Sequence, residues 1–506
     1  MSSREPALPD LTIEVDGVPL DGAARVSLGE IRVVQKLSLP AQCELAFFNQ
    51  PAANVRAHLQ PGALLCVKTG AGRPPLFDGE ITAVELVYEP AQGRRLRVRG
   101  YDLCHRLRKR QPLRTHRQVG LREIATELVG PLGLSVAAPG GGPTWRHLLQ
   151  HGQTDFEFLA EMASRSGQFF ALREGTLHLF SLEGIGDSIA LELGRNLHSA
   201  EIEINGEPAC RSVSTEAWDP ALAKVHKAGA SRARGGREVA AQVPPGRVGG
   251  VDQRTLPHRF AAADEHAEAF AQAELDLRLA REIVLRGVAE GDSRLRPGAR
   301  VAVAGIAAEV AGRYVLTEVT HRLGTPTGFV TEFSTCPPAP QRPRSTTEFA
   351  LGEVTSVADP EELGRVKVSL PACNDLETDW LGVILPGAGF GKGLVISPDV
   401  GDKVLVLCAQ GDPAQGLVLG GHYGIAGPPA GSVVGGRVKR FVWVTPANQQ
   451  LFFDDDGKIT RLEDASGSHV EFAPGKVRLH SKADLDIEAP GKTITVRAAH
   501  INFEKG

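Results

Sequence analysis

The chain has 506 residues and a formal net charge of −4, with 42% hydrophobic and 23% charged residues. That length is too great for one hydrophobic core, so we expect three or four domains of about 100–200 residues each. The nearly neutral charge of the whole chain gives no reason to expect nucleic acid or an anionic membrane as a partner. Many glycines (57) and prolines (34) with only 5% aromatics favour short strands joined by tight turns.

The cysteines indicate free thiols. There are seven, an odd number, and none forms a C-x-x-C pair, so neither a disulfide framework nor a zinc cluster is expected. We expect no cofactor. The N-terminal segment lacks the apolar stretch of a signal peptide, and no run of about 18 apolar residues predicts a membrane helix. We therefore expect synthesis in the cytoplasm without a signal peptide.

Residues 11–100 predict a series of strands separated by Gly, Pro and Asn clusters. Such spacing is typical of a barrel or a sandwich. The apolar and alternating runs are residues 11–15, 31–34, 43–47, 64–67, 80–87 and 95–99.

The next segment, residues 115–185, predicts helices. Residues 121–129 have helical periodicity and end at Gly130 and Pro131. Thr154 and Glu157 form a capping-box pattern at the start of a second helix, and Gly167 lies just beyond its end. Residues 169–172 and 176–180 then predict a hairpin.

Two further segments complete this half of the chain. Residues 226–255 are rich in Gly, Arg and Ala and poor in large apolar groups, which predicts a mobile surface loop. Residues 263–280 predict a helix with a narrow stripe of small residues, suited to close packing on a sheet or a partner. More strands are expected up to Phe333.

Composition divides the chain into an N-terminal part (1–335), a Pro-rich linker (336–348), a compact all-β unit (349–425), a Gly/Pro linker (426–440) and a tail (441–506). The tail contains a repeat in which two apolar residues flank one polar residue, with steps of 8, 9 and 7 residues between pairs. Such a repeat predicts stacked short strands, which bury too little to hold alone and need the same edge of other chains. The pairs are Val477/Leu479, Leu485/Ile487, Ile494/Val496 and Ile501/Phe503.

Several motifs, in this order, resemble one family. Residues 149–167 (LQHGQTDFEFLAEMASRSG), 298–305 (GARVAVAG) and 312–321 (GRYVLTEVTH) resemble the hub of VgrG proteins and of phage late control D proteins. Residues 352–360 (GEVTSVADP), 364–368 (GRVKV), Trp380 and 398–406 (PDVGDKVLV) resemble that family's OB-fold neck. Residues 459–503, including 462–467 (LEDASG), resemble its triple-stranded β-helix.

The resemblance implies a mainly β homotrimer: N-terminal β-barrel hub domains with a few helices, an OB-fold neck and a C-terminal intertwined triple-stranded β-helix. It implies a structural spike of a contractile injection system rather than an enzyme. Two similar barrels per chain would form a pseudo-hexameric ring that docks on the six-fold inner tube and meets baseplate proteins. The spike would contact the target membrane transiently. The length of the chain and its end at Gly506 resemble spikes of phage-tail-like or extracellular particles more than a type VI spike with a fused toxin. Release of the assembled particle from the cell is therefore one expectation.

The family also implies a separate tip protein of the PAAR type. At the tip, three strands end together and leave backbone groups open around an apolar centre, and such ends associate unless covered. We expect the tip protein to contact Ile501, Asn502, Phe503, Glu504, Lys505 and Gly506.

Rival functions have weaker signals. Residues 387–393 (GAGFGKG) suggest a phosphate loop, but Lys392 is not followed by Ser or Thr. His147 and His151 have the spacing of zinc ligands on a helix, without the catalytic glutamate. His500 lies near the tip without a second histidine at 498 or 502, so no metal is expected there.

Two alternative classes of function remain open. Residues 94–117 carry ten Arg or Lys against one acid, Asp102, which would suit a DNA-binding tail component, although alternation with Leu96 and Val98 is typical of a solvated strand face. A cell-wall (peptidoglycan) hydrolase is the other alternative. The family can insert a lysozyme between OB fold and β-helix, but only the short segment 426–436 stands there.

Overall fold

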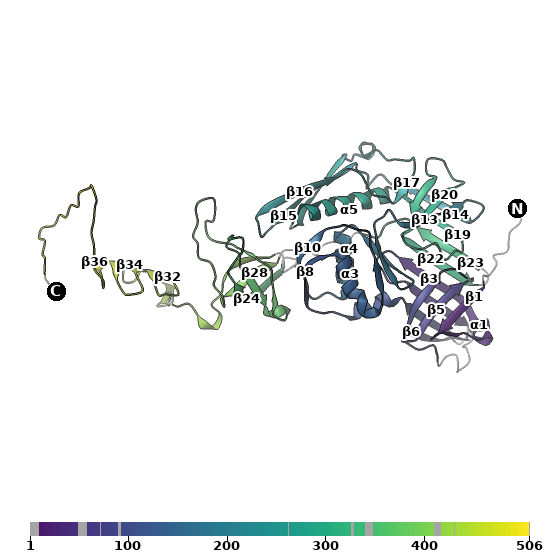
Figure 1. The fold of residues 1–506 in the computed structure, drawn as a ribbon, viewed down its shortest axis with the longest axis horizontal. Coiled ribbons are helices and arrows are strands. Elements are labelled where there is room, and N and C mark those ends of the chain that lie inside the picture. Colours follow the sequence, from purple (N-terminus) through teal and green to yellow (C-terminus); the bar gives the residue numbers. More distant parts are fainter. Residues whose placement is uncertain are drawn as a thin grey trace. The chain divides into compact units, whose positions relative to one another are not determined.

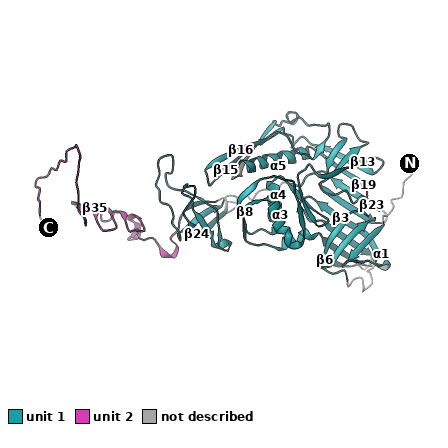
Figure 2. Ribbon diagram, in the orientation of Figure 1, with its two compact units in different colours: residues 1–421 teal, residues 422–506 magenta. Residues whose placement is uncertain are grey.

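The structure is a computed structural model that describes residues 10–48, 58–70, 72–89, 93–261, 263–324, 328–339, 348–408, 416–429 and 431–504. The chain separates into two compact units, residues 1–421 and 422–506 (Figure 2). Strands dominate both units (Figure 1). Within the described ranges, no helix is long and apolar enough to cross a membrane.

The first unit begins with a curled antiparallel sheet. Its strands alternate buried and exposed side chains, as the sequence predicts, and Val33, Leu45, Val67 and Val98 belong to its apolar core. Asp21 caps the short helix α1 (Gly22–Ser27) by accepting the amide of Ala24. The strands are β1 (Leu11–Val15), β2 (Val18–Pro19), β3 (Leu28–Lys36), β4 (Gln42–Phe48), β5 (Leu64–Thr69), β6 (Phe77–Glu89) and β7 (Gly93–Tyr101).

A second barrel is built from the C-terminal half of the hub. Its core contains Leu285, Val301, Tyr314 and Phe333. Its strands are β13 (Ile185–Glu192), β14 (Leu197–Ile204), β17 (Arg237–Glu238), β19 (Ile283–Glu290), β20 (Ala299–Ala304), β21 (Gly312–Val315), β22 (Glu318–Gly324) and β23 (Gly328–Ser334). Strand β22 pairs with β3 along its whole length, so β14, β19, β22 and β23 of the second barrel continue the sheet of the first as one 11-stranded sheet. The other strands of the second barrel, β13, β20, β21 and β17, form a separate four-stranded sheet.

A helical segment lies between the barrels in the sequence and has its own core. Both predicted helices are confirmed, and Thr154 and Glu157 form the predicted capping box. The predicted hairpin is confirmed as β11 and β12. The elements are η1 (Leu103–Lys109), β8 (Arg114–Gly120), α3 (Leu121–Val129), η2 (Gly130–Leu132), β9 (Ser135–Ala137), β10 (Thr144–Gln150), α4 (Asp155–Arg165), β11 (Phe169–Arg173) and β12 (Thr176–Phe180).

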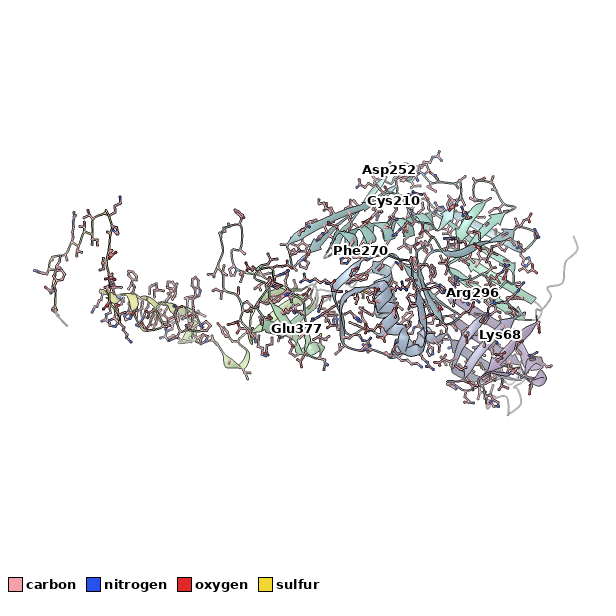
Figure 3. All side chains as sticks on the ribbon, in the orientation of Figure 1. Lys68, Cys210, Asp252, Phe270, Arg296 and Glu377 are labelled. Carbon is pink, nitrogen blue, oxygen red and sulfur yellow. The ribbon has the colours of Figure 1, made fainter. Side chains whose placement is uncertain are left out.

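The prediction of a mobile loop over residues 226–255 is wrong at both ends of that range, while most of residues 231–252 is irregular apart from β17 and one short helix. Most of β16 (Lys224–Ala230) and the start of β18 (Gln253–Phe260) fall in this range, and both pair with β15 (Ser212–Asp219). The short helix η3 (Pro245–Val248) lies between them. Small residues suffice here because α5 (Asp264–Glu282) covers the sheet closely: Ala217 and Ala267 are buried together, with Phe270 packed against them (Figure 3). The predicted helix over 263–280 is confirmed as α5.

One arginine ties three parts of the hub together. The Arg296 guanidinium is largely buried and donates to the carbonyl of Ser293 at 2.8 Å and to that of Pro75 at 2.7 Å (Figure 3). It also pairs with Glu174 at 3.4 Å. These partners belong to the second barrel, to the loop before β6 and to the β11–β12 turn, so a single side chain fixes the packing of all three.

The rest of the first unit is a six-stranded sheet with its own core. Its elements are β24 (Glu348–Ser356), β25 (Lys367–Leu370), η4 (Pro371–Cys373), β26 (Leu376–Glu377), β27 (Gly382–Val383), β28 (Lys403–Cys408) and β29 (Gly416–Gly421). Ion pairs join it to the hub: Arg146 to Asp379 at 3.2 Å, and Arg117 to Glu377 (labelled in Figure 3) at 3.7 Å. Of the predicted Pro-rich linker, residues 340–347 lie outside the described residues.

The second unit contains a small antiparallel meander. It starts with η7 (Gly424–Ala426) and the hairpin of β30 (Val433–Val434) and β31 (Arg437–Val438). The five strands of the main sheet pair strictly in chain order. They are β32 (Arg440–Val444), β33 (Gln450–Asp454), β34 (Ile459–Glu463), β35 (His469–Ala473) and β36 (Lys476–His480). Asp454 and Asp464 shape two of its turns by accepting backbone amides.

Candidate assembly surface of the second unit

One face of the five-stranded meander is almost entirely apolar. The register places two rows of side chains across the strands. Because alternate residues of a strand point to the same face, these neighbouring rows form one surface, which we call the apolar face. The first row is Trp443, Leu451, Leu462, Val470 and Leu479; the second is Phe441, Phe453, Thr460, Phe472 and Val477.

The apolar face lies open to solvent in the single chain. Seven of its side chains expose between 39% and 67% of their surface, among them both aromatic residues of β32, and Leu479 exposes 58%. Exposed apolar surface of this continuity is uncommon on proteins that remain monomeric and marks an interaction site. A five-stranded sheet with one bare apolar face therefore needs a partner surface.

The opposite face, which we call the polar face, is mainly polar in β34–β36, mixed in β32 and β33, and carries its own ion pairs. Arg461 pairs with Glu463 at 2.9 Å and with Glu471 at 3.2 Å. Arg440 pairs with Asp454 at 3.1 Å at the start of the sheet. The sheet thus has one face suited to water and one suited to burial, which determines the side on which a partner would pack.

The predicted inner pairs divide into two groups in the structure. Val477 and Leu479 lie on the apolar face of β36. The remaining pairs, Leu485/Ile487, Ile494/Val496 and Ile501/Phe503, are exposed and lie in residues 481–504, where the structure assigns no strand, in contrast to the predicted stacked strands. The physical reason is that a strand of three residues gains too little from packing within one chain.

The predicted tip residues lie at the end of the same segment. Ile501, Asn502, Phe503 and Glu504 are exposed, with Phe503 95% accessible. Lys505 and Gly506 lie outside the described residues. The role of the whole set in binding a tip protein stays a prediction.

The sequence search missed the first half of the apolar face. Phe441/Trp443, Leu451/Phe453 and Val470/Phe472 are apolar pairs of the same kind as Val477/Leu479. Two of these pairs escaped notice because the residues between them, Val442 and Phe452, are apolar too, so no alternation with polar residues was visible. A search for the pair spacing alone would have found them.

The basic segment 94–117 is partly neutralised within the chain. Arg97 pairs with Glu44 and Glu85, each at 3.0 Å, and Arg110 pairs with the fully buried Asp155 at 2.9 Å. Arg114 and Arg117 pair with acids as well. Because these guanidinium groups already hold carboxylates from neighbouring elements, the segment offers less free positive charge than its composition suggests.

The spacing of His147 and His151 would suit a zinc ion only if both residues lay on one helix, and they do not. His147 lies on strand β10, not on a helix, and neither of its ring nitrogens has a hydrogen-bond partner. Burial lowers the pKa of His147 to about 4, so the ring stays neutral near pH 7. Among the described residues, no group of three or more His, Cys, Asp or Glu side chains is arranged to hold a metal ion.

The glycine-rich segment 387–393 is a loop between β27 and β28, and no helix follows it. Phosphate loops hold their anion at the N-terminus of a helix, so the context for nucleotide binding is missing. Gly387, Gly391 and Gly393 have positive φ angles, which explains the residue type through backbone shape.

The hub contains a cleft of about 930 Å³, lined by both arginine and glutamate side chains. Its arginines are engaged in holding the chain: Arg300 donates to three backbone carbonyls, and the Arg234 guanidinium lies 3.6 Å from the buried Asp276. Burial raises the pKa of Asp276 to about 6. The backbone amide of Arg234 and the side chain of Gln272 donate hydrogen bonds to this carboxylate and lower its pKa, but burial has the larger effect. This arrangement serves packing between α5 and the second barrel.

Comparisons with known proteins agree with this geometry. Residues 350–423 match the family described as the type VI secretion system/phage-baseplate injector OB domain. Residues 9–325, more than half of the chain, match the Alg8 N-terminal domain.

Solved structures show the same fold at low identity. One is the E. coli c3393 protein, described as a component of the type VI secretion system with similarity to bacteriophage tail proteins (15% identity, TM-score 0.52, covering 81% of this chain and 99% of that one). Another is from the half-lidded Francisella PdpA-VgrG complex (8% identity, TM-score 0.55, 93% and 87%). The chain therefore belongs to the Alg8 N-terminal domain family and, with its injector OB domain, is a VgrG-type hub-and-spike protein of contractile injection systems.

Proposed function

We propose that three copies of this chain form the hub and needle of a contractile injection machine, with their apolar faces packed together around a common axis. The observation that carries the proposal is the exposed apolar face of the meander, from Phe441 to Leu479. Three such faces can bury one another, and the polar faces then point outward. The segment 481–504 would gain its strands only in this assembly, continuing the core through Leu485, Ile487, Ile494, Val496, Ile501 and Phe503.

The mass of the purified full-length protein tests this proposal. Each chain has a mass of 53.9 kDa, so the trimer should have three times that mass. Multi-angle light scattering at micromolar concentration should report the trimer across the elution peak. A monomer or a dimer under these conditions would refute the proposal.

The hub suits docking on a six-fold tube. Each chain contributes two barrels that share a continuous sheet through the β3–β22 pairing. Three chains would therefore present six barrels in a ring, which is the number that a six-fold inner tube requires. In this proposal the ring meets the tube and the surrounding baseplate proteins. We further propose that the domains follow the predicted boundaries, with the hub at 1–335, the neck at 349–425 and the spike at 441–506.

We propose a mechanical rather than a catalytic role. Between β29, which ends at Gly421, and β30, which begins at Val433, the chain has only 11 residues, too few for an inserted hydrolase domain. The needle would cross the target membrane transiently when other proteins contract the sheath. The protein would be made in the cytoplasm and assembled into a particle, which is released from the cell in some machines of this type.

We also propose that a small PAAR-type protein covers the tip, one per trimer. The support is the exposure of Ile501 and Phe503 next to the end of the chain. Co-expression of the full chain with candidate tip proteins should co-purify one cap with three chains. Removal of residues 497–506 should abolish the cap while leaving the trimer mass of the remaining chain unchanged. Retention of the cap after this truncation would place its site elsewhere.

A further inference from the structure

The polar face of the meander carries two histidines in contact. His469 on β35 and His480 on β36 are directly opposite each other in the antiparallel register. Their ring centroids are 5.0 Å apart and their planes are tilted by 38°. Because both strands run in one sheet within one chain, this pair exists without any partner copy. It does not depend on the proposed trimer.

The hydrogen bonds of His469 leave one nitrogen available. Its Nδ1 lies 3.0 Å from the carbonyl oxygen of Gly467, which can only accept, and 3.3 Å from the Arg461 guanidinium, which can only donate; with the shorter contact as the hydrogen bond, Nδ1 carries the proton. Nε2 is then the nitrogen with the lone pair, and it is buried without a hydrogen-bond partner. An imidazole held by a backbone carbonyl through one nitrogen, with the other free, has the arrangement found in metal-ligating histidines.

Charges of both signs surround the pair. Arg461 approaches Nδ1 of His469 at 3.3 Å, a longer contact than that of the Gly467 carbonyl, and its guanidinium is paired with Glu463 and Glu471. Lys482 is a second cation beside Gly467, with its ammonium 2.9 Å from where a Cβ of that residue would stand. The arginine's charge is thus compensated by two carboxylates, and Glu463 stands opposite His469 on β34, in the same cross-strand row.

We propose that His469 and His480 together bind one divalent transition-metal ion on the outer face of the spike. Two imidazoles favour copper, nickel or zinc over calcium or magnesium, which prefer oxygen ligands. Imidazole nitrogens lie about 2.0–2.1 Å from a bound ion, and a ring-centroid separation of 5.0 Å leaves room for one ion held by both rings. Water would fill the remaining positions. The ion would link β35 to β36 at the point where the described sheet ends, and so resist fraying of the last strand.

Copper binding to the full-length protein tests this proposal. The variants are His469→Gln, His480→Gln and, as a matched control, His500→Gln, an exposed histidine of the same unit. Circular dichroism without metal should be the same for all four proteins, because the substituted side chains lie on the polar face or outside the sheet. Calorimetric titration with Cu²⁺ should then show the proposed tight site in the wild type and in His500→Gln. In His469→Gln and in His480→Gln, the number of tight sites per chain should be lower by one. We expect the loss of one imidazole to weaken this site about tenfold or more, since the second ligand acts at high effective concentration.

Electron paramagnetic resonance of the Cu²⁺-loaded protein gives the second readout. At one equivalent, the wild type should show two nitrogen donors, and His469→Gln and His480→Gln should each lose that signature. The proposal is overturned if neither substitution removes the tight site or if His500→Gln removes it. Loss in only one of the two variants would also overturn it, because it would mean a single-histidine site. The chain has 15 histidines, so the difference between variants, and not the total copper bound, decides the outcome.

Discussion

Leu479→Asp should prevent assembly of the full-length protein into a trimer. Leu479 lies on the apolar face opposite Val470. In the proposed assembly, the substitution places three carboxylates together in a dry core, where each costs several kcal/mol unless it is protonated. Light scattering should then report monomers or aggregates, and the thermal transition of the second unit should disappear or fall far below that of the wild type.

Lys476→Asp is the matched control. It introduces the same carboxylate three residues earlier in the same strand, but on the polar face, where water solvates it. We expect the trimer mass to be retained and the thermal midpoint to change little. Equal effects of the two substitutions would show that the faces are assigned wrongly. Ile487→Asp against Asp486→Asn extends the comparison beyond β36: only the first should disrupt the trimer if the apolar face continues there.

Asp359→Asn should destabilise the OB domain by about 3–5 kcal/mol, the usual cost of leaving one member of a buried ion pair alone. Asp359 and Arg365 form a two-pronged pair, with Oδ1–Nη2 at 2.7 Å and Oδ2–Nε at 2.9 Å, and each side chain is only 3% exposed. The amides of Glu361 and Leu363 also donate to this carboxylate. Calorimetry of the full-length protein should show the transition of the first unit at a lower temperature.

Glu353→Gln is the control for that experiment. It makes the same acid-to-amide change in the same sheet, but its partner Lys403 is 56% exposed and Glu353 itself 46%. Exposed ion pairs contribute about 0–1 kcal/mol, so the transition should hardly move. If Glu353→Gln destabilised the domain as much as Asp359→Asn, burial would not be the cause.

The same pair predicts a dependence on pH. The Arg365 guanidinium and several amides hold the pKa of Asp359 well below its usual range. A carboxyl with a lowered pKa in the folded state contributes stability that is complete above its unfolded pKa of about 3.9 and is lost as the pH falls below it. The difference in unfolding temperature between wild type and Asp359→Asn should therefore be constant above about pH 5 and narrow below about pH 4.

Local pattern was enough to predict much of this fold. The helix at residues 155–165 follows from a capping box and a glycine just beyond its end, within 14 residues of sequence, and the helix and its capping box are confirmed. The strands of the first barrel follow from alternation, because burial on one side of a pleated sheet has a period of two. The order of hub, OB-fold and spike motifs was likewise sufficient to recognise the family. All these signals lie within short stretches of the chain.

Only the tertiary structure decided what depends on distant partners. The pairing of β3 with β22 joins residues nearly 300 positions apart, and no local pattern specifies it. The ends of residues 226–255 looked like a loop because their strands carry few large apolar groups, yet α5 packs against this sheet. The apolar face and the His469–His480 pair arise from the register of β32–β36: the sequence determined which residues alternate, and the folded meander determined which of them stand side by side.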